Sequence, residues 1–368
     1  MSKIALKPSD TGTGTFTFES PATNTDRTLT LPDGDGTIVA AEDSAVKLPA
    51  GTTAERPANP VAGMIRYNTD EAYIEYYDGD REQWLPTSDT FRPIQATGGT
   101  VTDITQDGIN YRVHTFTTVG TSSFQVTQGG EVEYLVVAGG GGGGGGWQGG
   151  GGGAGGLLTG IFESGPQSYT VNVGDGGLGG SDDGNGSFNQ MPTDGQNSSV
   201  FGETSIGGGQ GAGEQSPNSG LTSNAAGSGG SGGGGSHNST PTENGGSGTP
   251  GQGNDGGNGV SASPNFVGGG GGGAEASGQN ATSSKAGDGG DGVVNSINGT
   301  STFYSGGGGG SHRTNTNGSG GLGGGGNGGG TGEDGSPNTG GGGGAGADQG
   351  NRRAGDGGSG IVIIRYPI

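Results

Sequence analysis

The chain of 368 residues has no cysteine, so neither disulfides nor thiolate metal sites can stabilise its fold. Apolar residues make up 25% of it and aromatic residues 6%, too little for one hydrophobic core of this length. No stretch approaches the roughly 18 apolar residues of a membrane span, and the first residues lack the apolar segment of a secretory signal. We therefore expect neither membrane insertion nor signal-dependent export.

Positive charge is also scarce, with 14 Lys and Arg against 35 Asp and Glu and a net charge of -21. Nucleic-acid binding needs a basic stripe, which this sequence does not contain, so we expect no nucleic-acid partner. A large net charge keeps a protein soluble and discourages non-specific adhesion to anionic surfaces. Contact with a cell would then depend on particular side chains.

Signals of catalysis or cofactor binding are weak. The histidines, His114, His237 and His312, are scattered, with no partner at zinc-ligand spacing. Asp182 and Asp183 are adjacent, so they cannot face one another across a sugar as glycosidase carboxylates do. Matches to Gly-x-Gly-x-x-Gly are inevitable at this composition. We expect no enzyme activity, no cofactor and no strong metal site, and weak surface calcium binding stays open.

What the sequence does have is glycine: 100 residues, of which 13 lie in 1–138 and 87 in 139–360. This step predicts a boundary at Gly139. Outside the glycine region, short alternating segments predict β-strands, including a hairpin over 63–79 and strands at 131–137 and 361–366. Pairing of those last two would place the beginning and end of the glycine region side by side. We expect an all-β, sandwich-like sheet and no substantial α-helix.

Gly-rich, low-complexity sequence is most often a flexible linker, and this alternative stays open. Collagen is excluded because a strict Gly-X-Y repeat is missing. Near-pure glycine can instead form left-handed helices with three residues per turn, whose backbone groups bond to neighbouring helices in a hexagonal lattice. We identify twelve glycine runs: 139–146, 149–156, 176–180, 207–213, 229–235, 245–253, 268–273, 287–292, 306–310, 320–332, 340–346 and 355–360.

If these runs alternate outward and back, the loops between them sort into two ends. The predicted sheet-side loops are 157–175, 214–228, 254–267, 293–305 and 333–339, and the apolar residues of three of them suggest packing on the sheet. The predicted far-side loops are 147–148, 181–206, 236–244, 274–286, 311–319 and 347–354. The far side holds every Lys, Arg and His of the region and its tryptophan. We take as candidate residues for binding a polar, saccharide-like or protein-loop surface Trp147, Gln148, His237, Lys285, His312, Arg313, Arg352 and Arg353.

Particular segments resemble bacteriophage proteins. "LPAGTTAERPANPVAGMIRYNTD", followed by "IEYYDG" and Trp84, resembles a module of phage tail fibres and other virion proteins, and "TGTGTFTFESPATNTDRTLTLPDGDGTIV" resembles the start of marine phage structural proteins. "VEYLVVAGGGGGGG" with the closing "GSGIVIIRY" resembles a glycine-rich module of marine phage fibres. The predicted architecture of glycine runs and loops resembles the receptor-binding tips of phage tail-fibre adhesins. The resemblance implies a homotrimeric tail fibre of the virion that binds a host surface protein or polysaccharide.

This resemblance and the sequence pattern divide the chain into four expected parts. Residues 1–40 would attach to phage tail or baseplate proteins, and 41–95 would form a β-rich, trimerising collar or shaft. Residues 96–138 with 361–368 would form the base sheet, and 139–360 a polyglycine II tip domain. Two other functions stay open: a capsid-borne head fibre or decoration protein, and, more remotely, an ice-binding polyglycine protein.

Overall fold

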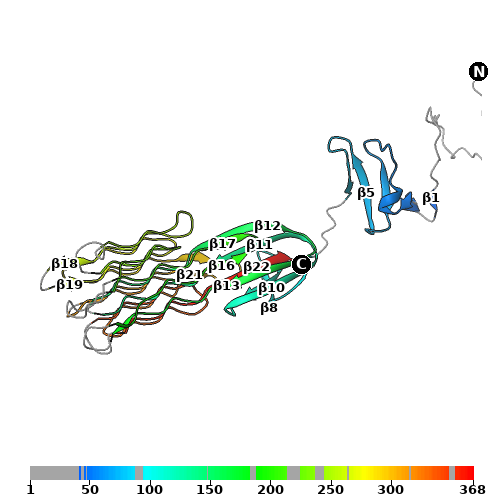
Figure 1. The fold of residues 1–368 in the computed structure, drawn as a ribbon. Helices are drawn as coiled ribbons and strands as arrows, with labels where there is room; N and C mark the ends of the chain where they lie inside the picture. Colours follow the sequence, from blue (N-terminus) through cyan, green and yellow to red (C-terminus); the bar gives the residue numbers. More distant parts are fainter. Residues whose placement is uncertain are drawn as a thin grey trace, which may run out of the picture. The chain divides into compact units, whose positions relative to one another are not determined.

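The computed structural model describes residues 41–42, 45–46, 48–87, 94–146, 148–182, 188–213, 224–236, 244–262, 265–314, 316–347 and 353–368. The expected attachment segment, 1–40, lies outside the described residues. The chain divides into two compact units, Met1–Phe91 and Arg92–Ile368, and each is described by itself (Figure 1). The described residues form strands and a single short 3-10 helix, Thr53–Glu55, so the all-β prediction is confirmed. Within them no helix has the length and apolar character needed to cross a membrane.

The first unit contains a small sheet that we call the collar, residues 48–87. Its strands are paired in the order β3-β4-β5-β6, and an isolated pair, β1 and β2, precedes them. Their bounds are β1 Ala41–Glu42, β2 Ala45–Val46, β3 Ala50–Gly51, β4 Ile65–Asn68, β5 Tyr73–Asp78 and β6 Gln83–Pro86. The predicted hairpin is confirmed, with Tyr67 opposite Ile74.

The second unit starts as a sandwich of two five-stranded sheets, ordered β17-β16-β13-β10-β7 and β12-β11-β22-β9-β8. The bounds are β7 Gln95–Thr97, β8 Thr100–Gln106, β9 Ile109–Phe116, β10 Gly120–Gln128, β11 Gly130–Val137, β12 Leu157–Ser164, β13 Ser168–Val173, β16 Ser198–Val200, β17 Glu203–Ser205 and β22 Ile361–Pro367. Alternate apolar residues of both sheets meet between them, among them Phe124, Val136 and Ile364, which form the main core.

The expected pairing of 131–137 with 361–366 is confirmed, with Val137 opposite Ile361 and Glu133 opposite Arg365. The base is larger than expected, because β12, β13, β16 and β17 come from beyond Gly139. A hairpin of β20 Val293–Asn295 and β21 Thr302–Tyr304 contributes Ile297 and Tyr304 to a second core on the outer face of β11 and β22. The predicted packing of 293–305 against the sheet is thereby confirmed.

Beyond the sandwich, the glycine region forms a lattice of extended segments. In 139–146, every third residue bonds to the same neighbour: the N–H groups of Gly140 and Gly143 donate to Gly358 and Gly355, at 2.9 and 3.0 Å. Six segments surround this one, three accepting its N–H groups and three donating to its carbonyls: 149–156, 191–197 and 353–360, then 174–180, 206–213 and 340–347. A three-residue repeat with six hydrogen-bonded neighbours is the arrangement expected of polyglycine II.

The number of lattice segments differs from the predicted twelve runs. Five further segments belong to the lattice although they contain many polar residues: 191–197, 224–229, 253–259, 277–282 and 332–336. They lie on the rim, where many of their side chains face solvent, whereas a Cβ at their glycines, such as Gly195 and Gly257, would overlap neighbouring backbone. In addition, the predicted run 245–253 is interrupted by a turn, in which Gln252 donates to the carbonyl of Thr249 at 3.0 Å.

Because these segments were not predicted, some loops lie at the end of the lattice opposite to the predicted one. The predicted sheet-side loop 254–267 instead ends in the hairpin of β18 Val260–Ala262 and β19 Asn265–Val267, far from β11 and β22 (Figure 1). The predicted sheet-side loop 214–228 is misplaced in its described part, because Asn224 pairs with Gly213 at the outer end and 224–228 lies in the lattice. Conversely, 198–205 lies in the base sheet rather than on the far side. The errors cancel in pairs, so 157–175 and 293–305 lie at the sandwich as predicted. Of the predicted loop 333–339, the turn at 337–339 lies there, whereas Glu333, Gly335 and Ser336 bond to neighbouring segments within the lattice.

Candidate functional site at the distal end of the glycine lattice

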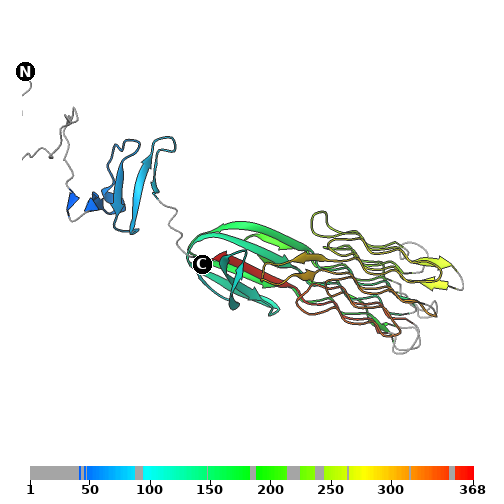
Figure 2. The same ribbon diagram turned by 180° about the vertical axis from the view of Figure 1, so that it is seen from behind.

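We call the end of the lattice opposite the sandwich the distal end (Figure 2). Turns between outward and returning segments bring distant parts of the chain together there. Backbone bridges connect Gln148 with Ala347, Val267 with His312, and Lys285 with Thr316. A further hairpin, β14 Ser181–Asp182 with β15 Phe188–Gln190, follows the outward segment 174–180. Residues from the whole of the glycine region therefore contribute to one surface.

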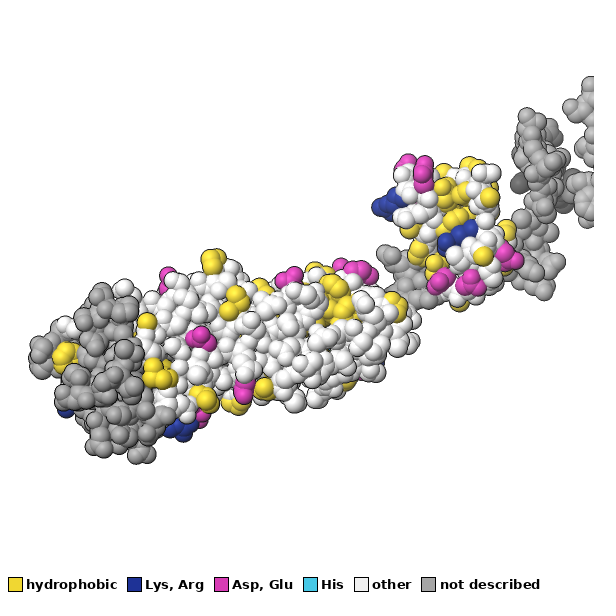
Figure 3. All heavy atoms as spheres, in the orientation of Figure 1, with side chains coloured by type: hydrophobic (Ala, Val, Ile, Leu, Met, Phe, Trp, Pro, Cys, Tyr) yellow, Lys and Arg dark blue, Asp and Glu magenta, His cyan; other side chains and the backbone are white. Residues whose placement is uncertain are grey.

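Positive charge within the lattice is confined to this end in the described residues, where it consists of Lys285, Arg313 and Arg353. Figure 3 shows Lys and Arg side chains near this end on one face. Lys285 forms an ion pair with Asp288 at 2.5 Å, and Arg353 forms one with Asp356 at 3.0 Å. About half of the Arg353 side chain, 52%, is exposed, and Arg313 is exposed as well. These groups can present N–H donors to a ligand.

His312 lies at the distal end as predicted but is buried, with 3% of its surface exposed. Its Nδ1 accepts a hydrogen bond from the N–H of Thr314 at 3.0 Å, and its Nε2 lies 3.5 Å from the carbonyl oxygen of Ser283. The N–H of His312 also donates to Asn317. Its visible role is therefore to connect two distal turns, and the sequence-based assignment to a contact surface is corrected.

Gln148 is corrected in the same way, because its side chain is fully buried. Neither amide atom has a hydrogen-bond partner among the described residues. As the chain stands, this amide cannot contact a receptor. The remaining candidates, Trp147, His237 and Arg352, lie outside the described residues.

The sequence analysis missed the β18–β19 hairpin as part of the distal end. Val267 packs there with Ala281 and Ala286, and Val260 lies against this small apolar cluster. A usable signal was present in the preceding segment, where Asp255 and Asn258 accept the N–H groups of Gly248 and Gly245, at 2.8 and 2.9 Å. Asp and Asn among glycines at such spacing indicate a rim segment of the lattice rather than a loop.

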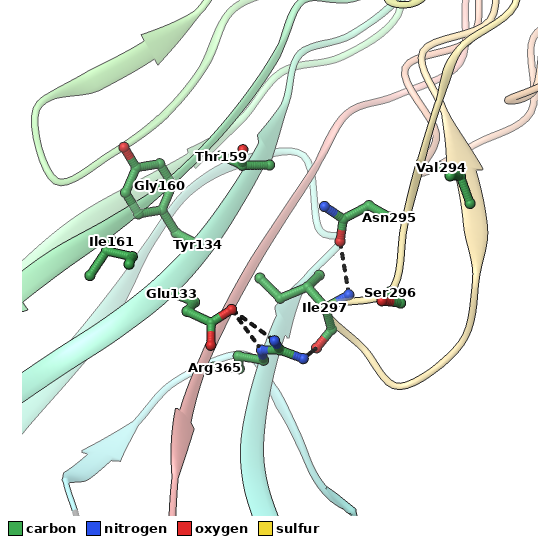
Figure 4. Close-up of a pocket in the computed structure, with 10 residues that line it drawn as sticks. All are labelled: Glu133, Tyr134, Thr159, Gly160, Ile161, Val294, Asn295, Ser296, Ile297 and Arg365. Atoms are coloured by element: carbon green, nitrogen blue, oxygen red, sulfur yellow. Dashed lines mark hydrogen bonds and ion pairs between the residues drawn. The ribbon is translucent and has the colours of Figure 1, made fainter. Parts of the chain in front are cut away.

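An open hollow on the outer face of the sandwich was considered as a second site (Figure 4). The charged pair within it is Arg365 with Glu133, 2.8 Å apart. The Arg365 guanidinium also donates to Gln106 and to the carbonyl of Ile297, and it lies 4.4 Å from the ring centre of Tyr111. These bonds attach the β20–β21 hairpin to the sheet, so the pair has a structural role.

The part of the chain that the structure describes contains no group of three or more His, Asp or Glu side chains placed to hold a metal ion. The distal end offers hydrogen-bond donors, the cationic groups of Lys285, Arg313 and Arg353, and a small apolar hairpin.

Comparison with known proteins gives one family. The Glycine-rich domain family matches residues 117–367, which covers well over half of the chain. No curated protein matches the sequence. The match includes strands β10, β11 and β22 and the whole lattice, and it leaves the sandwich strands β7, β8 and β9 outside. The chain belongs to the Glycine-rich domain family.

Proposed function

We propose that this chain is a virion fibre whose distal end attaches a bacteriophage to its host cell. The observation that carries the proposal is the collection of turns from the whole glycine region at one end of a lattice, opposite the sandwich. Turns on a rigid scaffold can vary in sequence without disturbing the lattice, which suits a surface that must match a variable partner.

The chemistry of the distal end favours a polar receptor, either a polysaccharide or a loop of an outer-membrane protein. Arg313 and Arg353 offer planar donor groups that match carboxylates, phosphates and sugar hydroxyls. Residues 139–360 carry 16 Asp and Glu against 4 Lys and Arg, which discourages non-specific adhesion to an anionic cell and leaves attachment to particular distal groups. Each contact is weak, so several copies on one particle would supply avidity.

The resemblance of the first 90 residues to virion proteins supports the proposed attachment of the chain to the phage particle. Residues 1–40 would bind a tail or baseplate protein, and the collar would join copies into a homotrimer. The localisation we propose is the tail fibre of the virion, with no catalytic step and no cofactor. The capsid-borne head fibre or decoration protein is the alternative that the same modules allow.

The test is binding of the purified, fluorescently labelled full chain to a panel of intact marine bacteria, read by flow cytometry. We expect saturable binding to one or a few strains and a loss of at least about tenfold in affinity for the variant K285A/R313A/R353A, equivalent to about 1.4 kcal/mol. The matched control is R112A, which removes an exposed guanidinium at the sandwich, where Arg112 pairs with Asp103 at 2.8 Å.

Equal binding by the triple variant and the wild type would remove these cations from the proposal. A folded chain that binds no strain of the panel, and does not compete with adsorption of a phage that encodes it, would contradict the adhesin. Labelling of capsids rather than tails by an antibody against the chain would favour the decoration protein.

A further inference from the structure

Each sheet of the sandwich has two edge strands, and β12 is the longest of the four. It has eight residues, whereas β8 has seven and β7 and β17 have three each. Its register with β11 continues without a bulge from Leu157 to Ser164. Proteins usually protect such edges with proline, lysine or a bulge, and β12 has none of these. Figure 1 shows β12 along the border of the sandwich.

The backbone of β12 has unused hydrogen-bonding groups on the side away from β11. The N–H of Leu157 points to that side and donates to the carbonyl of Gln252 at 3.1 Å. Because direction alternates along an antiparallel strand, the N–H and C=O groups of Thr159, Ile161 and Glu163 point the same way. Within the described residues, nothing bonds to these groups. Gln252 therefore occupies only the first position of the edge, and the remainder can accept another strand.

The surface beside this free edge is apolar and hollowed. Ile161 is 64% exposed, more than any other large apolar side chain of the described residues. A hollow of about 400 Å³ extends from it across the outer face of the sheet to Val294 on β20 (Figure 4). A second hollow, of about 340 Å³, adjoins Leu157 and Thr159. Alternate side chains of an added strand would lie on this face and could enter both hollows.

The end of β12 away from the lattice carries unpaired negative charge. Glu131 and Glu163 lie directly opposite one another on β11 and β12, and both are exposed. Like charges in this arrangement are destabilising. Arg365, on the strand next to β11, pairs with Glu133 instead, at 2.8 Å. Neither Glu131 nor Glu163 has an ion pair with another described residue. A lysine or arginine arriving beside Glu163 would relieve the repulsion between the two carboxylates.

We propose that the free edge of β12 binds an extended segment of a partner protein by antiparallel strand addition, with an apolar residue opposite Ile161 and a lysine or arginine opposite Glu163. These two partner residues are two positions apart, so both side chains lie on the outer face. Antiparallel pairing is the more stable kind per residue. A second copy of this chain suits the edge less well, because its net charge of -21 would add negative charge beside Glu131 and Glu163. The inference goes beyond the proposed function and does not depend on what the distal end binds.

The probe is a fluorescently labelled peptide, Thr-Lys-Thr-Val-Thr-Val-Thr, titrated with the full chain and followed by anisotropy. Antiparallel addition places its central valine opposite Ile161 and its lysine opposite Glu163. We expect saturable binding with a Kd at or below about 1 mM, and a loss of at least about tenfold for Ile161→Pro. This proline removes only an N–H that points away from β11, which edge strands tolerate. The matched control is Val101→Pro, at an exposed residue of β8, the other edge of the same sheet.

Modified peptides distinguish strand addition from charge attraction alone. N-methylation of the central valine removes its hydrogen bond to Ile161 and should abolish binding. N-methylation of the next threonine, whose N–H points away from β12, should leave most of the affinity. A peptide with glutamate in place of lysine should bind the wild type weakly and the variant Glu163→Lys more tightly.

Three results would overturn the proposal. The first is no binding of the probe at about 1 mM. The second is equal binding by the two N-methylated peptides, which would mean that backbone pairing is not involved. The third is unchanged peptide binding by Ile161→Pro together with weaker self-association of that variant in sedimentation velocity, which would assign the edge to a second copy of the chain.

Discussion

Gly143 lies in the middle of the first lattice segment, where backbone surrounds it on every side. A Cβ at this position would overlap the carbonyl oxygen of Gly344. That oxygen belongs to a segment fixed by its own hydrogen bonds, so it cannot move as the end of a flexible side chain could. The close packing of backbone explains why segments 139–146 and 149–156 consist almost entirely of glycine.

Gly143→Ala should therefore destabilise the lattice by about 1–3 kcal/mol, as overpacking does in apolar cores. The matched control is Gly165→Ala, whose added Cβ would meet its nearest atom, the Tyr169 hydroxyl, only at 4.0 Å. Urea denaturation of the second unit within the full chain measures the difference. Similar midpoints for the two variants would show that 139–146 is not packed as described.

His114 should make the stability of the sandwich depend on pH. Its ring is fully buried, with Nδ1 2.7 Å from the carbonyl oxygen of Gly98 and Nε2 3.0 Å from the Tyr366 hydroxyl. Burial lowers the pKa of His114, so the folded state holds the neutral ring while the unfolded chain takes up a proton near pH 6.5. The contribution of the neutral His114 ring to the free energy of unfolding is complete above that pH. It decreases below that pH, by at most about 1.4 kcal/mol per pH unit.

Urea midpoints at pH 7.5 and 6.0 give the measurement. The wild type should lose stability between these values, and His114→Gln should be less stable at pH 7.5 but change less between the two. An identical pH dependence in both proteins would mean that His114 does not contribute to it.

At the scale of the element, the rim segments need acceptors for N–H groups that have no neighbouring helix. Carboxylates take this place: Asp194 accepts from the N–H of Gln210, and Asp291 from that of Leu322, both at 2.8 Å. Asp356 does the same for Gly179 at 2.7 Å. Part of the acidic surplus of the glycine region is therefore structural, since side-chain oxygens replace the carbonyls of absent neighbours.

Asp194→Ala should cost about 0.5–1.5 kcal/mol, the usual net value of one hydrogen bond, because the N–H of Gln210 loses its acceptor. Asp194→Asn keeps an oxygen in the same place and should cost less than half as much. Thermal unfolding followed by calorimetry distinguishes the two variants. An equal loss in both would indicate that charge, rather than the hydrogen bond, is what Asp194 contributes.

The sequence alone predicts two kinds of element correctly: strands in which polar and apolar side chains alternate, and segments that consist almost entirely of glycine. The β11–β22 pair and the segments 139–146 and 149–156 were predicted from such patterns. Segments such as 191–197 could not be, because Pro192, Thr193 and Asp194 are typical of loops and their place is fixed only by neighbours distant in sequence. The burial of Gln148 and His312 likewise depends on which turns meet at the distal end, which the chain order alone does not specify.

At the scale of the molecule, the chain first leaves the sandwich after β11 and returns to it for the last time at β22, after forming β12, β13, β16 and β17 between lattice segments. The first lattice segment follows β11 and the last one precedes β22. Because β11 and β22 are paired, strand pairing fixes the positions of these two segments at the sandwich. The sandwich has a conventional apolar core, whereas the lattice is held by backbone hydrogen bonds. A rigid lattice is what allows its distal turns to act as one surface.

Hydrogen exchange of the full chain, followed by mass spectrometry, tests this central claim most directly. Residues 139–144 and 149–156, which are buried and whose N–H groups all donate to neighbouring segments, should exchange as slowly as strands β11 and β22 although they contain almost no side chains. The rim segments should exchange faster than these two. Exchange of 139–156 at the rate of an unstructured peptide would contradict the lattice and would support a flexible glycine linker.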